Sequence, residues 1–245
     1  MNIVMSEPIV LLPGLLCTEE LWTNVTPMLA DIVRPYVIDL TSSSSIGSMA
    51  EHVLAHGPSS FSLVGFSMGS QVALEVYARE PHRINRLALM SANAYGLTPG
   101  VRTHLMAAME RIAISGLDQY LAEAFALYFS ETAQASPALR DRFVAMANQL
   151  GVTVALRQME ALLSYGGFAS ALSAIQCPTK LICGSSDKRT PPSLHYDMAK
   201  DIASASVSVI PSCGHFTMLE SPHAVARLLR EWIVSSVAHS SRASG

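Results

Sequence analysis

The stretch FSLVGFSMGSQVALEV, residues 61–76, changes its pattern at the centre, and this change indicates the fold. It begins with a mainly apolar run, Phe61–Val64, of the kind that forms a buried strand. In its second half the apolar residues have the spacing of a helix. Between the two lies Gly-Phe-Ser-Met-Gly, residues 65–69, whose glycines permit a tight turn. The stretch therefore predicts a strand, a sharp turn that carries Ser67, and a helix.

Further apolar runs alternate with helical patterns along the 245 residues. Besides Phe61–Phe66, strands are predicted at Ile9–Leu12, Val33–Leu40, Ile84–Ser91, Thr179–Gly184 and Ser206–Ile210. Helices are predicted at Glu19–Leu29, Ile46–Ala55, Met68–Glu80, Pro192–Ile202 and Pro222–Val237. Continuous apolar strands separated by helices are typical of a parallel sheet that is covered on both faces. The sequence therefore predicts an α/β fold with about six mostly parallel strands.

Residues 97–174 interrupt this alternation. They contain no convincing strand, and apolar residues such as Leu121, Phe125 and Phe129 recur at helical spacing. Connections between a strand and a helix are usually only a few residues long. We therefore expect residues 1–96 and 175–245 to form the core and residues 97–174 to form a helical cap insertion. The alternative is that these helices simply cover the sheet. The Ser/Ala-rich tail Ser235–Gly245 is expected to fray.

The composition excludes several classes of function. Only 14% of the residues are charged and the net charge is −3, so no electrostatic surface for nucleic acid or an anionic membrane is expected. The apolar stretch Ile9–Leu16 is broken by Pro13-Gly14, and no basic residue precedes it, so we expect a buried strand and not a signal peptide. Cysteines without metal-binding spacing predict free thiols in a cytoplasmic protein: Cys17, Cys177, Cys183 and Cys213.

Three residues that follow predicted strands are candidates for catalysis. Ser67 lies in a G-x-S-x-G motif between a strand and a helix, where a serine can act as nucleophile. A serine hydroxyl is a poor nucleophile at neutral pH and needs a base. His215 follows the last strand, at the sheet edge where catalytic groups of α/β folds gather. Asp187 follows the preceding strand and is the candidate that orients the histidine.

Alternatives to these assignments remain open from the residues alone. The motif around Ser67 also fits a Gly/Ser-rich turn, and Asp187 also fits a turn or helix-cap residue. Asp39 ends a strand too, but it precedes the motif and is the weaker choice. Among the other histidines, His104 and His195 lie in helical patterns and are not excluded.

An oxyanion hole is the remaining requirement of such a site. We expect its donors to be the backbone N–H groups of Met68 and Leu15, the latter in the loop after the first strand. An apolar substrate pocket is expected around Leu16, Phe66 and Phe216. Three arginines of residues 97–174 could bind a carboxylate, although a solvated role is the simpler interpretation: Arg102, Arg111 and Arg157. No spacing predicts a metal site, a Walker loop or a dinucleotide fingerprint, so no cofactor is expected.

Taken together, several segments resemble the α/β-hydrolase superfamily, and the last two are particularly similar to its small capped esterases and enol-lactonases. The segments are LLPGLL at 11–16, GFSMG at 65–69, CGSSD…TPP at 183–192 and GHF…ESP at 214–222. The resemblance runs from Ile9 to about Val237 and implies the α/β-hydrolase fold. The usual His-Gly of the oxyanion loop is Pro13-Gly14 here, which removes a side chain but no backbone donor. The family's one or two preceding antiparallel strands are expected to be missing, which implies six strands rather than eight.

The resemblance also implies an activity. A serine hydrolase that cleaves a small carboxylic ester or lactone through an acyl-enzyme on Ser67 is the leading hypothesis, with a small molecule as its partner. The same three residues would also serve a thioesterase, a C–C bond hydrolase or a perhydrolase. A non-catalytic small-molecule receptor on the same fold is the alternative from another class.

Overall fold

A computed structural model of the chain describes residues 7–240, with side chains through Ser235. Its strands form one sheet with the order β2-β1-β3-β4-β5-β6, and every neighbouring pair is parallel. The prediction of about six mostly parallel strands is therefore confirmed. The strands are β1 Glu7–Leu12, β2 Val33–Val37, β3 Phe61–Phe66, β4 Ile84–Met90, β5 Thr179–Gly184 and β6 Ala205–Ile210.

The central strands are apolar because helices cover both of their faces. Every residue of β3 is buried, whereas the edge strand β2 is partly exposed and contains Pro35. That strand ends at Val37, earlier than predicted. In the register of the sheet, Leu12 at the end of β1 pairs with Gly65 near the end of β3. The loops that follow these strands therefore leave the sheet side by side.

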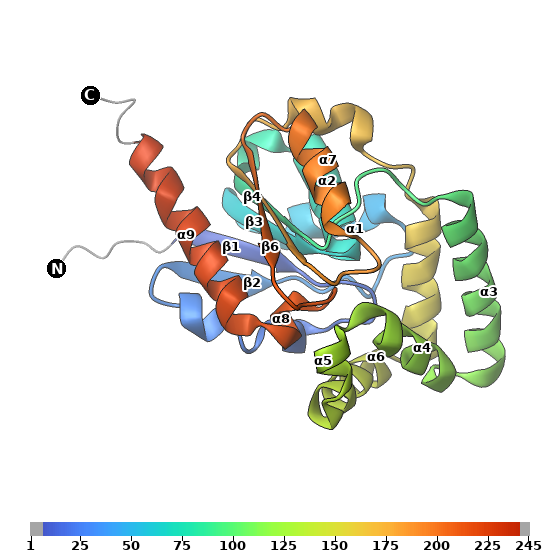
Figure 1. Cartoon of the computed structure of the whole chain (residues 1–245). Coiled ribbons are helices and arrows are strands. Elements are labelled where there is room, and N and C mark those ends of the chain that lie inside the picture. Colours follow the sequence, from blue (N-terminus) through green and yellow to red (C-terminus); the bar gives the residue numbers. More distant parts are fainter. Residues whose placement is uncertain (1–6, 241–245) are drawn as a thin grey trace.

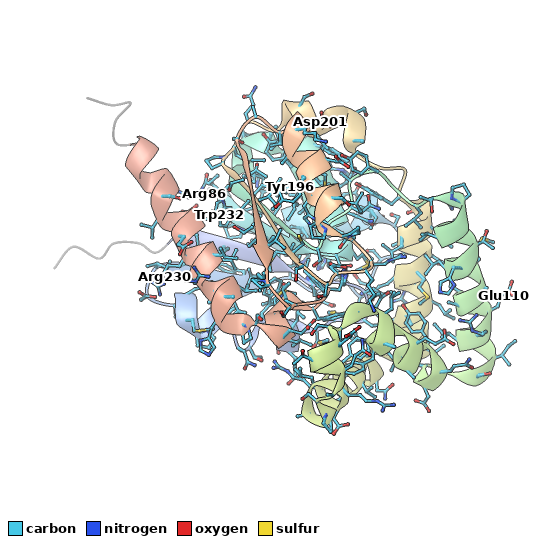
Figure 2. All side chains as sticks on the ribbon, in the orientation of Figure 1. Arg86, Glu110, Tyr196, Asp201, Arg230 and Trp232 are labelled. Atoms are coloured by element: carbon cyan, nitrogen blue, oxygen red, sulfur yellow. The ribbon has the colours of Figure 1, made fainter. Side chains whose placement is uncertain are left out.

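Helices pack against the two faces of the sheet (Figure 1). The long helix α9 lies across one face, and α1, α2 and α7 lie on the other. Side chains fill the space between sheet and helices, while Glu110 points outward from α3 (Figure 2). The α-helices outside residues 97–174 are α1 Ile46–His56, α2 Met68–Arg79, α7 Pro192–Asp201, α8 Thr217–Glu220 and α9 Pro222–Ser240, with a 3₁₀ turn η3 at Pro81–Arg83.

Two helix predictions differ from the structure. The helix predicted at Glu19–Leu29 is instead two short 3₁₀ helices, η1 Glu19–Trp22 and η2 Thr26–Leu29. Pro27 lies at the start of η2, and a proline has no N–H with which to continue a helix from the preceding turn. At the other end, α9 continues to Ser240, so residues 235–240 of the predicted frayed tail are helical. Residues 241–245 lie outside the described residues.

The segment 97–174 is helical and contains no strand. Its helices up to residue 164 lie beyond the carboxyl ends of the strands (Figure 1), whereas residues 169–174 pack beside α7 and lead into β5. The long helix α6 is kinked at Gly151, whose φ of 71° is in the left-handed region that glycine tolerates. We call residues 97–174 the helical segment. It comprises α3 Pro99–Ser115, α4 Asp118–Tyr128, α5 Glu131–Gln134, α6 Pro137–Ser164 and the 3₁₀ helix η4 Ala169–Ala174.

Candidate active site

Ser67 lies at the turn between β3 and α2 in a strained backbone conformation. Its φ is 52° and its ψ is −113°, a region that residues with a side chain rarely adopt. The turn is tight because its glycines lack side chains. A Cβ on Gly65 would lie 2.3 Å from the carbonyl oxygen of Gly69, and one on Gly69 would lie 2.5 Å from that of Leu12. The Ser67 side chain is thereby presented at the carboxyl edge of the sheet.

The structure brings the three candidate residues into one hydrogen-bonded chain. His215 Nε2 lies 3.0 Å from Ser67 Oγ, and His215 Nδ1 lies 2.9 Å from Asp187 Oδ2. A carboxylate only accepts hydrogen bonds, so Nδ1 carries the proton and Nε2 is free to accept one from the serine hydroxyl. Both Asp187 and His215 are 2% exposed. This arrangement can remove a proton from Ser67.

Asp187 is held ionised by its neighbours. Its Oδ1 accepts hydrogen bonds from the main-chain N–H groups of Arg189 and Thr190, and its Oδ2 accepts one from the Thr190 hydroxyl. Burial alone raises the pKa of the Asp187 carboxyl, but His215 and these hydrogen bonds outweigh burial and lower that pKa from 3.8 to about 2. The turn role and the role beside His215, considered as alternatives from sequence, are both present in the structure.

The loop that carries His215 is fixed from three sides. The His215 N–H donates to the carbonyl of Tyr128, and the Ser91 hydroxyl donates to the His215 carbonyl. Glu220 accepts from the N–H of Gly214 through Oε1 and from the N–H of Ser130 through Oε2. Ser130 and Tyr128 belong to the helical segment, so this segment helps to set the position of the imidazole.

Aromatic rings exclude water from one side of the imidazole. The rings of Phe66 and Tyr128 each lie 5.2 Å from that of His215. Phe216 packs against Phe66 and stacks on Phe129 of the helical segment, with 5.1 Å between ring centroids in both pairs. A site lined in this way has a low local dielectric, which strengthens the hydrogen bonds within it.

The loop after β1 lies directly against the nucleophile candidate. A Cβ on Gly14 would lie 3.3 Å from the Cβ of Ser67 and 2.9 Å from the Phe66 ring, so glycine permits this approach. Leu15 lines the cavity beside Ser67, and Met68 is the first residue of α2, whose N-terminus carries the positive end of the helix dipole. Both predicted N–H donors therefore belong to segments that border Ser67.

Leu16 does not line the cavity, contrary to the sequence prediction. Its φ is 56°, and its side chain is 2% exposed and packs into the core. The Leu16 N–H donates to Oε1 of the buried Gln158, 2.8 Å away, and Gln158 Nε2 donates to the carbonyl of Leu40. A side chain of α6 thus holds the loop next to Ser67, a role that no sequence motif indicated.

The cavity at the candidate site has a volume of about 360 Å³, within the range of small-molecule sites. Ser67 and His215 lie in its wall, and residues of the helical segment line it together with residues from the rest of the chain. Phe66 and Phe216 line it as predicted. Its polar groups include Gln71, Asn93, Tyr120, Tyr128 and Arg189.

The sequence matches the model of a known family, the Alpha/beta hydrolase family, over residues 9–228. This match spans most of the chain. The chain belongs to the alpha/beta hydrolase family. The predicted fold class and the resemblance stated from the motifs are therefore confirmed.

Two relatives illustrate the range of chemistry in this family. A putative 2-succinyl-6-hydroxy-2,4-cyclohexadiene-1-carboxylate synthase of Bacillus subtilis strain 168 is 26% identical over 262 residues, which cover 94% of this chain and 91% of the relative. A pimeloyl-(acyl-carrier protein) methyl ester esterase of Chromobacterium violaceum is 25% identical over 189 residues, which cover 75% of this chain and 74% of the relative. The chain is similar to both.

Two solved structures share the alpha/beta hydrolase fold of this chain. An esterase from Thermogutta terrifontis superposes with a TM-score of 0.84 at 22% identity, covering 94% of this chain and 90% of that one. An enol-lactonase from Burkholderia xenovorans LB400 superposes with a TM-score of 0.85 at 17% identity, covering 96% and 94%.

Asp39 and the three arginines considered for carboxylate binding do not line the Ser67 cavity. Asp39 is exposed and accepts hydrogen bonds from Thr41. The cavity contains Arg189 instead of those three arginines. Arg111 pairs with Glu123, and Arg157 donates to the carbonyl of Thr41. No cluster of metal-binding side chains and no helix able to cross a membrane is found among the described residues.

His195 is a buried histidine near the site but not part of it. It is fully buried on α7, where Nε2 accepts a hydrogen bond from the Ala92 N–H at 3.0 Å and Nδ1 lies 3.3 Å from the carbonyl of Pro191. A proton on Nε2 would oppose the Ala92 N–H. Burial lowers the pKa of His195 from 6.5 to about 4. The neutral ring therefore connects α7 to the end of β4.

This depressed pKa predicts a loss of stability in mild acid. The unfolded chain binds the His195 proton at about pH 6.5, whereas the folded chain binds it only near pH 4. The contribution of neutral His195 to the free energy of unfolding is therefore complete above pH 6.5 and is lost as the pH falls toward 4. The expected loss is about 3 kcal/mol of the free energy of unfolding. Urea unfolding at a series of pH values measures it. His195→Gln should show a weaker pH dependence, and equal slopes for both proteins over this range would contradict the assignment.

Proposed function

We propose that this protein is a serine hydrolase that cleaves a small carboxylic ester or lactone through an acyl-enzyme on Ser67. The observation that carries the proposal is the continuous hydrogen-bonded chain from the Ser67 hydroxyl through the His215 imidazole to the Asp187 carboxylate. Membership of the alpha/beta hydrolase family and the similarity to a methyl ester esterase support the same chemistry.

In the proposed mechanism, His215 Nε2 takes the proton of the Ser67 hydroxyl as Oγ attacks the carbonyl carbon of the substrate. Negative charge then develops on the carbonyl oxygen, and the N–H groups of Leu15 and Met68 stabilise it. The imidazolium returns its proton to the leaving alcohol, and an ester of Ser67 remains. Water, deprotonated by the same imidazole, attacks this ester and releases the acid. Asp187 keeps the ring oriented and stabilises the imidazolium throughout.

We further propose that residues 97–174 act as a cap on a core formed by residues 1–96 and 175–245. Tyr128 and Gln158 support this role, because they contact the histidine loop and the loop after β1, respectively. A cap in contact with both loops can exclude water from the acyl-enzyme until the alcohol has left.

A cytoplasmic site of action completes the proposal. All four cysteines are free. Burial raises the pKa of the thiols of Cys17, Cys183 and Cys213 to about 12 and that of Cys177 to about 11, so these thiols are unreactive near neutral pH. Free, unreactive thiols fit a reducing compartment.

A fluorophosphonate probe followed by peptide mapping tests the nucleophile directly. The probe reacts with an activated serine, so we expect one label per chain, on the peptide that contains Ser67. Asp187→Asn should slow labelling strongly, because the histidine loses its orienting carboxylate. A label on another residue, or none under conditions that modify a known serine hydrolase, would contradict the proposal. A panel of short methyl esters, lactones, acyl-thioesters and a peroxide acceptor assay then identifies the preferred bond.

A further inference from the structure

Arg189 brings a guanidinium to the wall of the Ser67 cavity. It lines this cavity of about 360 Å³ and also a neighbouring one of about 200 Å³, which extends beneath α3 and α4. The two cavities have a common boundary formed by Val101, Leu105, Tyr120, Tyr128 and Arg189. The arginine therefore lies at the end of the reactive cavity that continues into the helical segment.

The charge of Arg189 is not compensated by the groups around it. Glu123 lines the smaller cavity, but it pairs with Arg111 at 3.1 Å. Asp187 lines neither cavity, and its carboxylate is occupied by His215 and by donors of the adjoining turn. Among the described side chains, no carboxylate forms an ion pair with the Arg189 guanidinium. An uncompensated cation in a largely apolar cavity attracts an anion.

The main chain fixes Arg189 relative to the reactive groups. Its N–H donates to Oδ1 of Asp187 at 2.9 Å, and the next residue, Thr190, bonds the same carboxylate. The same Asp187 carboxylate also hydrogen-bonds the His215 imidazole, so it fixes both the main chain of Arg189 and the imidazole. The wall of this cavity is mostly apolar, with Leu97, Leu162 and Leu194 among its residues.

We propose that the substrate carries a carboxylate remote from its reacting carbonyl, joined to it by an apolar chain, and that Arg189 binds this carboxylate. The inference deepens the proposed hydrolase function and rests on it. A guanidinium binds a carboxylate through two parallel hydrogen bonds, which fixes the direction of the bound molecule as well as its charge. Anchoring at this end directs the carbonyl toward Ser67 Oγ, so the favoured substrates are monoesters of dicarboxylic acids, or lactones that carry a free carboxylate.

Matched methyl esters test this specificity. The charged substrates are the monomethyl esters of succinate, glutarate and adipate. Each is compared with a neutral methyl ester that has a methyl group in place of the free carboxylate. Hydrolysis is monitored through the release of protons at constant pH. For at least one pair, kcat/KM of the charged ester should exceed that of the neutral ester by about tenfold or more. Arg189→Met should lower this ratio about tenfold, and Arg189→Lys should retain part of it. Lys188→Met is the matched control, because Lys188 is an exposed cation of the same turn that lines neither cavity, and it should leave the ratio unchanged.

Direct binding separates this inference from the proposed hydrolysis. Calorimetry with adipate and Ser67→Ala protein needs no turnover, and binding should weaken with salt and in the Ser67→Ala, Arg189→Met double variant. If no ester is cleaved but adipate binds through Arg189, the hydrolase proposal fails and the anion site stands. If neutral esters are cleaved while no diacid ester is preferred, or if Arg189→Met leaves the preference intact, the anion site is overturned and the hydrolase proposal stands.

Discussion

Ser67→Ala should lower the turnover of ester substrates by about 10⁴-fold or more, because among the described residues the Ser67 hydroxyl is the one hydrogen-bonded to Nε2 of His215. The His215 imidazole remains in the variant but has only water to activate. The fold should persist, because alanine keeps the Cβ of serine and needs no more space in the turn. Hydrolysis of a methyl or p-nitrophenyl ester measures the loss, and thermal unfolding shows that the variant is folded.

A second serine of the same strand serves as control. Ser62 lies at the opposite end of β3, where its hydroxyl donates to Glu7 at 2.7 Å. Ser62→Ala should keep turnover within about threefold of the unsubstituted protein, because it removes one hydrogen bond far from the site. Turnover by Ser67→Ala close to that of Ser62→Ala would remove Ser67 from the mechanism.

Gly184→Ala should damage both the fold and the site. A Cβ at this position would lie 2.0 Å from the carbonyl oxygen of Cys213 and 2.2 Å from that of Gly214. Both atoms are main chain, so no side chain can rotate away, and the end of β5 must separate from the loop that carries His215. We expect the free energy of unfolding to fall by about 3 kcal/mol. In the protein that remains folded, kcat/KM should fall by about 100-fold, since Asp187 and His215 lose their alignment. Urea unfolding and ester kinetics measure the two effects.

Glycine to alanine at a position where the added Cβ meets no neighbouring atom is the matched control for Gly184→Ala. A Cβ on Gly100, near the start of α3, would meet no atom within 4 Å. Gly100→Ala should therefore leave kcat/KM unchanged and raise the stability of the helix by about 0.5–1 kcal/mol. Equal behaviour of the two variants would show that the contact between β5 and the histidine loop is not tight.

The parts of the fold that sequence predicted well depend on local patterns. The turn around Ser67 is specified by its own glycines, since Gly65 and Gly69 each meet backbone within the same turn or the adjoining strand. The central strands are continuous apolar runs because both faces of the sheet are covered. The predicted helix at Glu19–Leu29 was wrong where a single residue, Pro27, interrupts an otherwise helical pattern.

The features that sequence missed arise from contacts between distant segments. Leu16 belongs to the predicted oxyanion loop, next to Leu15. A positive φ and a hydrogen bond to Gln158, 142 residues away, nevertheless direct its side chain into the core and not into the cavity. Arg189 lies in an ordinary turn sequence, and only the folded structure shows that it lines the Ser67 cavity. The position of a residue in the sequence does not tell where its side chain points or which distant residues it contacts.

The two hydrogen bonds of Gln158 affect how this protein can be recombined with its relatives. A chimera that receives another protein's residues in place of 97–174 would leave the Leu16 N–H and the Leu40 carbonyl without the amide that now satisfies them. Buried groups left in this way destabilise the loops that bear them. Substrate preference can therefore be transplanted between homologues only when the donor fragment keeps an amide at this position or is exchanged together with both recipient loops.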